Sequence, residues 1–182
     1  MPLVVTISGL HGTGKSTYAK TLAEEFKLRY VSAGQLFRDI AKEKGVSMER
    51  LIQITANDPE IDHLIDERTK REAEKGDVIL EGQLAGWMAK DKGGLKIFLT
   101  APEDVRIKRI AERDSVGFEK AKAQTVLRDK AEREKYKKYY DIDITDISIY
   151  DLIMDTSLLS LEESIKILKN MISDYIARQP RR

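Results

Sequence analysis

The sequence predicts an α/β fold, a three-layer α/β/α arrangement in which a five-stranded parallel sheet lies between two layers of helices. Short strand-like apolar runs, the first of them rich in β-branched residues, alternate along the chain with segments of helical character; the runs are 3–7, 28–31, 78–80, 97–100 and 152–154. Such alternation is typical of a parallel sheet that is covered on both faces. A glycine-rich motif directly after the first run supports the same fold class.

That motif is Gly9-Leu10-His11-Gly12-Thr13-Gly14-Lys15-Ser16, which fits the pattern Gly-x-x-x-x-Gly-Lys-Ser/Thr at every fixed position. Glycines allow successive backbone N–H groups to surround a polyphosphate at the start of a helix, here expected over 16–23. We expect Lys15 to contact the β- and γ-phosphates and the Ser16 hydroxyl to take one position on Mg²⁺. The order of strand, loop and helix predicts the P-loop NTPase fold. A glycine turn that merely joins strand to helix would not need this lysine and serine.

The composition indicates a single domain over residues 1–182. Charged residues make up 35% of the chain, the formal net charge is +1, and there is no cysteine. A chain of this length can bury a substantial core without disulfides, and the absence of cysteine excludes thiolate metal sites and a cysteine nucleophile. The balanced charge gives no indication of nucleic acid or membrane partners, so we expect a monomer that binds small molecules.

The first apolar run is about five residues long and leads straight into the glycine motif. It therefore lacks the form of a signal peptide, and no apolar run in the sequence is long enough to span a bilayer. We expect a cytoplasmic protein.

The second strand is followed by a helix in which Ser32 is the expected N-cap and Arg38 lies near the first turns. A guanidinium group suits bidentate binding of a phosphate dianion, so Arg38 is a candidate for the phosphate of a second substrate. The alternative is an ordinary solvated arginine on a helix.

A long polar segment of helical character, 48–75, separates the second and third strands, and it exceeds what a crossover needs. It could form the wall of a second substrate pocket beside Arg38. Asp62 in this segment could accept a hydrogen bond from the exocyclic amine of a base. It could equally be an acidic residue in the first turn of a surface helix.

Polar residues follow the third strand, at the edge of the sheet where ligands bind in such folds. Glu81 could hold a water of the Mg²⁺ shell, and Gln83 offers the donor and the acceptor that reading a base edge requires. The alternative is a turn with a capping glutamate and an exposed glutamine.

After the fourth strand, Pro102 and Glu103 open a helix that carries Arg106, Arg109 and Arg113 on one face. A hinge over 114–118 leads to a second helix, over about 119–139, which presents Arg128, Glu132 and Lys135 at spacings of four and three. Two cationic faces joined in this way could close over a polyphosphate. Surface salt bridges explain most of the lysines and glutamates better, but we favour anion binding for Arg109, Arg113 and Arg128.

Taken together, these motifs resemble those of the nucleoside monophosphate kinases, and among them the cytidylate kinases of the archaeal type. The resemblance covers nearly the whole chain and is carried by the segments 7–17, 32–38, 81–87, 109–113 and 128–143. It implies a core, a helical monophosphate-binding part at about 32–76 and a mobile lid at about 114–140.

The resemblance also implies roles for individual residues. Arg38 would bind the acceptor phosphate, Arg109 and Arg113 the donor nucleotide and its phosphates, and Arg128 the closed lid. Bacterial members have an Arg-Asp pair after the third strand that contacts CMP, where this chain has Gln83 and Leu84, which shifts base recognition onto Asp62 and Gln83. The loop that would bind ATP comprises Ser8, Gly9, Leu10, His11, Gly12, Thr13, Gly14, Lys15, Ser16 and Thr17.

The implied activity is ATP- and Mg²⁺-dependent phosphorylation of CMP, and of dCMP, to the diphosphate. Kinases of UMP, of AMP or of a small polar metabolite are alternatives, although metabolite kinases commonly place an acidic base where this chain has 32–34. A regulatory GTPase would need an Asn-Lys-x-Asp motif, which the sequence lacks. A nucleotide-dependent interaction module is a further alternative.

Overall fold

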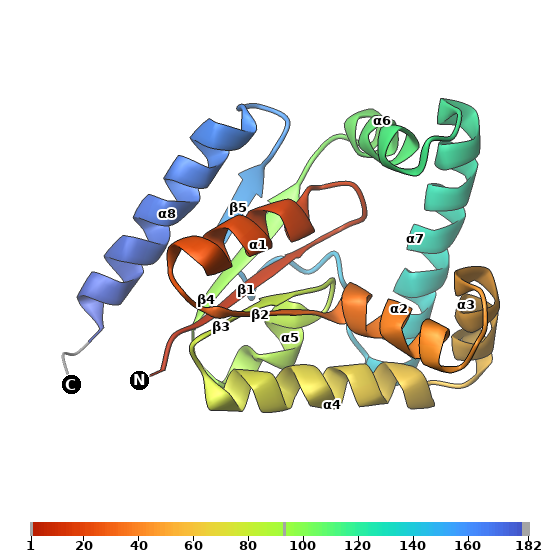
Figure 1. Ribbon diagram of the computed structural model, residues 1–182, viewed down its shortest axis with the longest axis horizontal. Helices are drawn as coiled ribbons and strands as arrows, with labels where there is room; N and C mark the ends of the chain where they lie inside the picture. Colours follow the sequence, from red (N-terminus) through yellow and green to blue (C-terminus); the bar gives the residue numbers. More distant parts are fainter. Residues whose placement is uncertain (1, 93, 180–182) are drawn as a thin grey trace.

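The computed structural model describes residues 2–92 and 94–179, and its centre is one five-stranded sheet in the order β2-β3-β1-β4-β5 (Figure 1). Every neighbouring pair of strands is parallel, which confirms the predicted fold class. Each strand overlaps the apolar run expected for it. The strands are β1 (Val4–Gly9), β2 (Arg29–Ser32), β3 (Val78–Glu81), β4 (Leu95–Thr100) and β5 (Leu152–Asp155).

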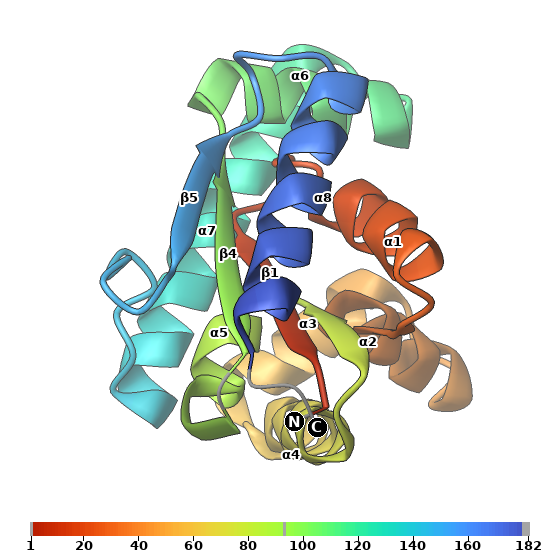
Figure 2. The same cartoon turned by 90° about the vertical axis from the view of Figure 1, so that its left-hand side faces the viewer.

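Helices cover both faces of the sheet, as Figure 2 shows in a view along its edge. One face packs against α1 (Lys15–Glu25) and α8 (Leu161–Arg178), and the other against α4 (Glu60–Lys75) and the short α5 (Ala85–Met88). Alternate residues of the central strand β1 enter the two cores, because successive side chains of a strand point to opposite faces. All of β1 is therefore buried, and the loop that follows it starts from a rigid base.

Three helices, α2 (Ala33–Glu43), α3 (Met48–Asn57) and α4, form a part with its own small core. The polar segment 48–75 is two helices rather than one, with the break at Asp58 and Pro59. A proline has no N–H to donate and disfavours helical backbone in the residue before it, and Asp58 is extended with φ −135°. The predicted boundaries of this part, about 32–76, stay a prediction.

The other helical part is a pair, α6 (Glu103–Asp114) and α7 (Phe118–Tyr140), which pack through Ile107, Ile110 and Ala121. The turn between them contains Ser115 in the left-handed region, at φ 53°. In Figure 1, α7 runs down from α6 past the carboxyl edge of the sheet, and its Lys135 pairs with Asp62 of α4. The remaining regular element is a 3₁₀ turn, η1 (Lys90–Lys92). Among the helices of the described ranges, none is long and apolar enough to cross a bilayer.

Candidate active site

The glycine-rich loop between β1 and α1 has backbone that only glycine adopts easily. Gly9, Gly12 and Gly14 have φ values of 143°, 81° and 87°. A Cβ atom on Gly12 would lie 2.5 Å from the backbone oxygen of Arg106, so α6 packs directly on the loop. Gly14 is the N-cap of α1 and supplies no side-chain acceptor to the N–H groups of the first turn. These groups can therefore donate to a bound phosphate.

Lys15, the first residue of α1, lies folded back over the loop. Its side chain is buried, and Nζ donates to the backbone oxygen of Leu10 at 2.9 Å. Burial lowers the pKa of the ammonium group, while the negative charges of Glu81 and Glu132 oppose that shift. The ammonium group therefore lies within the electrostatic influence of two carboxylates, at the loop where a polyphosphate would bind.

Glu81 stands at the carboxyl end of β3 and is 6% exposed. The strand register places it beside Ser32 of β2, whose Oγ donates to Glu81 Oε2 at 2.5 Å; the Tyr30 hydroxyl donates to the same oxygen at 3.2 Å. Burial raises the pKa of Tyr30. Ser32 also accepts from the backbone N–H of Gln35, which confirms the predicted helix cap. Glu81 is therefore held in one position at the edge of the sheet, near Lys15.

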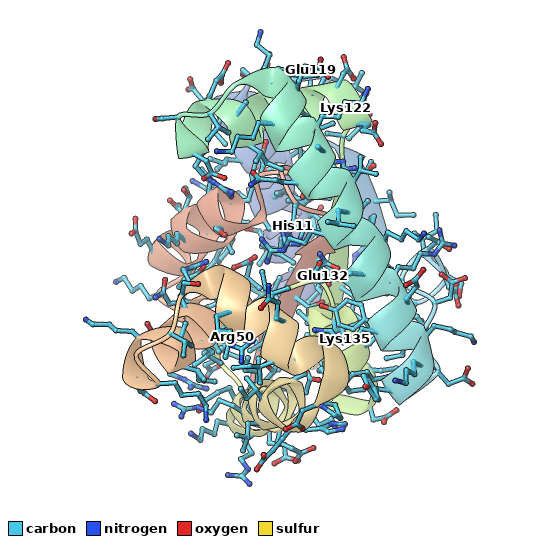
Figure 3. All side chains as sticks on the ribbon, turned by 90° about the vertical axis from the view of Figure 1, so that its right-hand side faces the viewer. His11, Arg50, Glu119, Lys122, Glu132 and Lys135 are labelled. Atoms are coloured by element: carbon cyan, nitrogen blue, oxygen red, sulfur yellow. The ribbon has the colours of Figure 1, made fainter. Side chains whose placement is uncertain are left out.

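Glu132 of α7 joins the glycine-rich loop to the loop after β3. Its Oε2 lies 2.8 Å from His11 Nε2 and 2.6 Å from Gln83 Nε2, and its Oε1 accepts from Arg128 Nε at 3.0 Å. Figure 3 shows His11 and Glu132 facing each other, with Lys135 farther along the same helix. Burial alone would raise the pKa of Glu132, but His11 and Arg128 outweigh it and hold the value at about 2. The carboxylate therefore stays charged.

Among the arginines that the structure describes, Arg106 is the buried one, and it lies against the loop. It is 6% exposed, and its NH1 donates to the backbone oxygen of His11 at 2.8 Å and to Asp129 Oδ2 of α7 at 3.0 Å. The sequence placed Arg106 on a face with Arg109 and Arg113 but did not single it out. Its contacts tie the glycine-rich loop to α7.

The expected common face brings Arg109 to the loop but not Arg113. Arg109 donates to the Thr156 hydroxyl at 2.9 Å and to the Thr156 backbone oxygen at 2.8 Å, and NH1 lies 3.5 Å from the backbone oxygen of Gly12. Arg113 is exposed at the end of α6 and makes two hydrogen bonds with Asp114. A donor nucleotide would have to draw Arg113 away from that pair.

The residues expected to bind a second substrate lie on α2 and α4. Arg38 is exposed on α2, and its NH2 donates to Gln35 Oε1 at 2.9 Å, toward the start of that helix. Asp62 of α4 accepts from Lys135 Nζ with both carboxylate oxygens, at 3.0 and 2.9 Å. Burial raises the pKa of Asp62 and Lys135 counteracts the rise. Asp62 therefore faces α7, and both of its oxygens are engaged.

Sequence reasoning missed two features of this site, the role of Arg106 and the role of Glu132 as a common acceptor. Arg106 carried a signal, since it lies between Val105 and Ile107 in the first turns of a helix expected beside the loop. Glu132 carried none beyond its spacing from Arg128, because its other partners lie far away in the sequence.

The sequence is similar to those of known proteins. The family model described as "Cytidylate kinase-like family" matches residues 4–74 and 56–158. A cytidylate kinase from Staphylothermus marinus is 46% identical over 96% of this chain and 98% of its own. A cytidylate kinase from Pyrococcus horikoshii is 45% identical over 93% of this chain and 88% of its own. The resemblance inferred from the motifs is thereby confirmed.

Solved structures share the fold at low sequence identity. A shikimate kinase from Bacteroides thetaiotaomicron superposes with a TM-score of 0.63 at 16% identity, over 95% of this chain and 99% of its own. A gluconokinase from Sinorhizobium meliloti gives 0.61 at 15% identity, over 99% and 98%. Both share the P-loop kinase fold with this chain, but their sequence identity to it is far lower than that of the two cytidylate kinases. The chain belongs to the cytidylate kinase-like family.

Proposed function

We propose that this protein transfers the γ-phosphoryl group of ATP to CMP, and to dCMP, which yields ADP and the nucleoside diphosphate. The observation that carries the proposal is the meeting of three elements at Glu132: the glycine-rich loop, the loop after β3 and helix α7. A donor held by the first and an acceptor held by the second would lie next to each other under the third. The names of the relatives indicate which acceptor this is.

On the donor side, the loop from Ser8 to Thr17 holds the phosphates of ATP. Its N–H groups and the start of α1 bind the oxygens, and Lys15 turns from the Leu10 oxygen to the β- and γ-phosphates. Arg109 and Arg113 bind the nucleotide and its phosphates from α6, and Arg128 does so from α7.

Ser16 at the start of α1 and Glu81 at the end of β3 fit a magnesium ion. A serine hydroxyl and a carboxylate are the hard oxygen ligands that Mg²⁺ prefers, and Glu81 already lies near Lys15 at the end of the loop. Ser16 would bind the ion directly and Glu81 through a water. When bound, the ion would neutralise charge on the transferring phosphate.

On the acceptor side, the part at about 32–76 holds the monophosphate. Arg38 binds its phosphate, which requires the guanidinium to leave Gln35. Gln83 and Asp62 read the base, which requires Asp62 to exchange Lys135 for the base amine. The lid at about 114–140 closes over both nucleotides and excludes water.

The chemistry needs no general base, because an acceptor phosphate is already an anionic nucleophile near neutral pH. It needs neutralisation of two anions that approach each other, in-line alignment and the exclusion of water, which would otherwise accept the phosphoryl group. Lys15 and the arginines supply the first two. We propose further that the protein acts as a monomer in the cytoplasm.

The test is an ADP-release assay with ATP and each of CMP, dCMP, UMP, AMP and GMP, together with a few small alcohols. CMP and dCMP should stimulate ADP formation strongly. If no monophosphate stimulated ADP formation above the ATPase background, the assignment as a monophosphate kinase would be refuted. If UMP, AMP or an alcohol were turned over faster than CMP, that molecule would replace CMP as the proposed acceptor.

A further inference from the structure

The side-chain amide of Gln83 has a hydrogen-bond partner for its nitrogen but none for its oxygen among the described residues. Its Nε2 lies 2.6 Å from Glu132 Oε2 and 2.9 Å from His11 Nε2. Its Oε1 is buried and has no hydrogen-bond partner among the residues that the structure describes. A buried acceptor without a donor costs free energy and calls for an explanation.

The carboxylate of Glu132 decides which way the Gln83 amide faces. A carboxylate only accepts hydrogen bonds, so the group of Gln83 that meets Glu132 must be its NH₂. Turning the amide over would set its oxygen against the oxygen of a charged carboxylate. His11 Nε2 meets the same carboxylate oxygen at 2.8 Å and must likewise carry a proton. The 2.9 Å approach of His11 Nε2 to Gln83 Nε2 therefore brings together two donors that share one acceptor, and it is not itself a hydrogen bond. Glu132 therefore accepts from both, and the carbonyl of Gln83 points away from it.

Asp62, the other residue proposed to read the base, already has a partner. Both oxygens of Asp62 accept from Lys135, at 3.0 and 2.9 Å. Cytosine carries an amine donor at C4, where uracil carries a carbonyl acceptor. A fixed carbonyl from Gln83 would pair with the amine and would meet the uracil oxygen as one acceptor against another.

We infer that Glu132 is a positioning residue that selects cytosine over uracil by holding the Gln83 amide with its carbonyl oxygen toward the base. The inference rests on the proposed function and names the residue that sets its base specificity. It also means that one carboxylate on α7 serves base selection and contacts the glycine-rich loop through His11.

The experiment compares kcat/KM for CMP and for UMP in the wild type, Glu132→Gln and Glu134→Gln. A glutamine at position 132 offers both a donor and an acceptor, so the Gln83 amide is no longer held in one orientation. The ratio of CMP to UMP should fall at least tenfold in Glu132→Gln. It should stay unchanged in the control, because Glu134 is 70% exposed on the same helix and lies 3.9 Å from Lys130.

A double variant separates positioning from a general structural effect. If Glu132 acts through Gln83, Glu132→Gln should cause no further loss of selectivity in a Gln83→Leu background. Should Glu132→Gln fail to fold, Glu132→Asp keeps the charge but withdraws it by one methylene, and selectivity should again fall.

Three outcomes overturn the inference: an unchanged ratio in the folded Glu132 variant, an equal fall in Glu134→Gln, or additive losses in the double variant. Its failure is distinct from that of the proposed function. A wild-type protein without activity on CMP refutes the function itself, whereas an active and selective wild type with unaffected variants refutes only the role of Glu132.

Discussion

Replacing Arg106 by methionine tests the link between the glycine-rich loop and α7. Methionine keeps most of the length and the apolar stem, so packing in the first turns of α6 should survive. The variant removes the hydrogen bonds to the His11 backbone oxygen and to Asp129. It also leaves the carboxylate of Asp129 without its cation, and the other oxygen of Asp129 has no hydrogen-bond partner within residues 2–92 and 94–179.

The size of the effect follows from burial. The side chains of Arg106 and Asp129 are 8% and 18% exposed. Removing one partner of a buried pair typically costs 3–5 kcal/mol, and we take the lower end, about 3 kcal/mol, because Asp129 keeps some contact with water. For a chain of this length that loss corresponds to a fall in Tm of about 6–12 °C. The freed His11 carbonyl should also raise KM for ATP more than KM for CMP.

Denaturant unfolding and steady-state kinetics measure both effects. The matched control is Arg133→Met, since Arg133 on α7 is 58% exposed and lies 3.9 Å from Asp143. That variant should lose no more than about 1 kcal/mol. The reasoning is refuted if Arg106→Met is as stable as the control, or if it shifts KM for ATP and CMP equally.

Three further predictions address single side chains. Lys15→Ala should lower kcat by about 100-fold or more through lost stabilisation of transition-state charge, and normal turnover would remove that role from the lysine. Asp62→Ala should raise KM for CMP more than KM for ATP; equal changes would leave Asp62 only its ion pair with Lys135. Burial raises the pKa of Asp66 from 3.8 to about 6, so its charged form is disfavoured in the folded protein. The stability of the wild type relative to Asp66→Asn should therefore be highest below about pH 4, fall as the pH rises to about 6, and stay level above it, for a total change on the order of 3 kcal/mol. Denaturation of both proteins across that range tests it, and a difference that grows with pH would contradict it.

The features that the sequence predicted correctly are those that depend on local pattern. Short apolar runs predicted each strand of the described sheet. The spacing of glycine, lysine and serine predicted the loop, and Ser32 at the end of β2 predicted the start of α2. The break before Pro59 follows from a local rule too, because a proline disfavours helical backbone in the residue before it, but we did not expect the segment to divide there.

What the sequence did not reveal depends on contacts between distant segments. His11 and Glu132 are 121 positions apart, and Gln83 and Glu132 are 49 apart. Helical spacing placed Arg106, Arg109 and Arg113 on one face but could not show where that face points. Only the packing of α6 on Gly12 decides that Arg106 is buried, whereas Arg113 at the helix end reaches solvent.

The length of α7 gives this site a mechanical property. At 1.5 Å per residue, Lys135 lies about 26 Å along the helix from its start at Phe118, next to the turn that contains Ser115. A rotation of about 10° at that turn would move the backbone at Lys135 by roughly 4–5 Å. Such a displacement exceeds the length of the ion pair between Lys135 and Asp62. Because α7 is long, a small angular change beside α6 is enough to make or break the ion pair between Lys135 and Asp62 of α4.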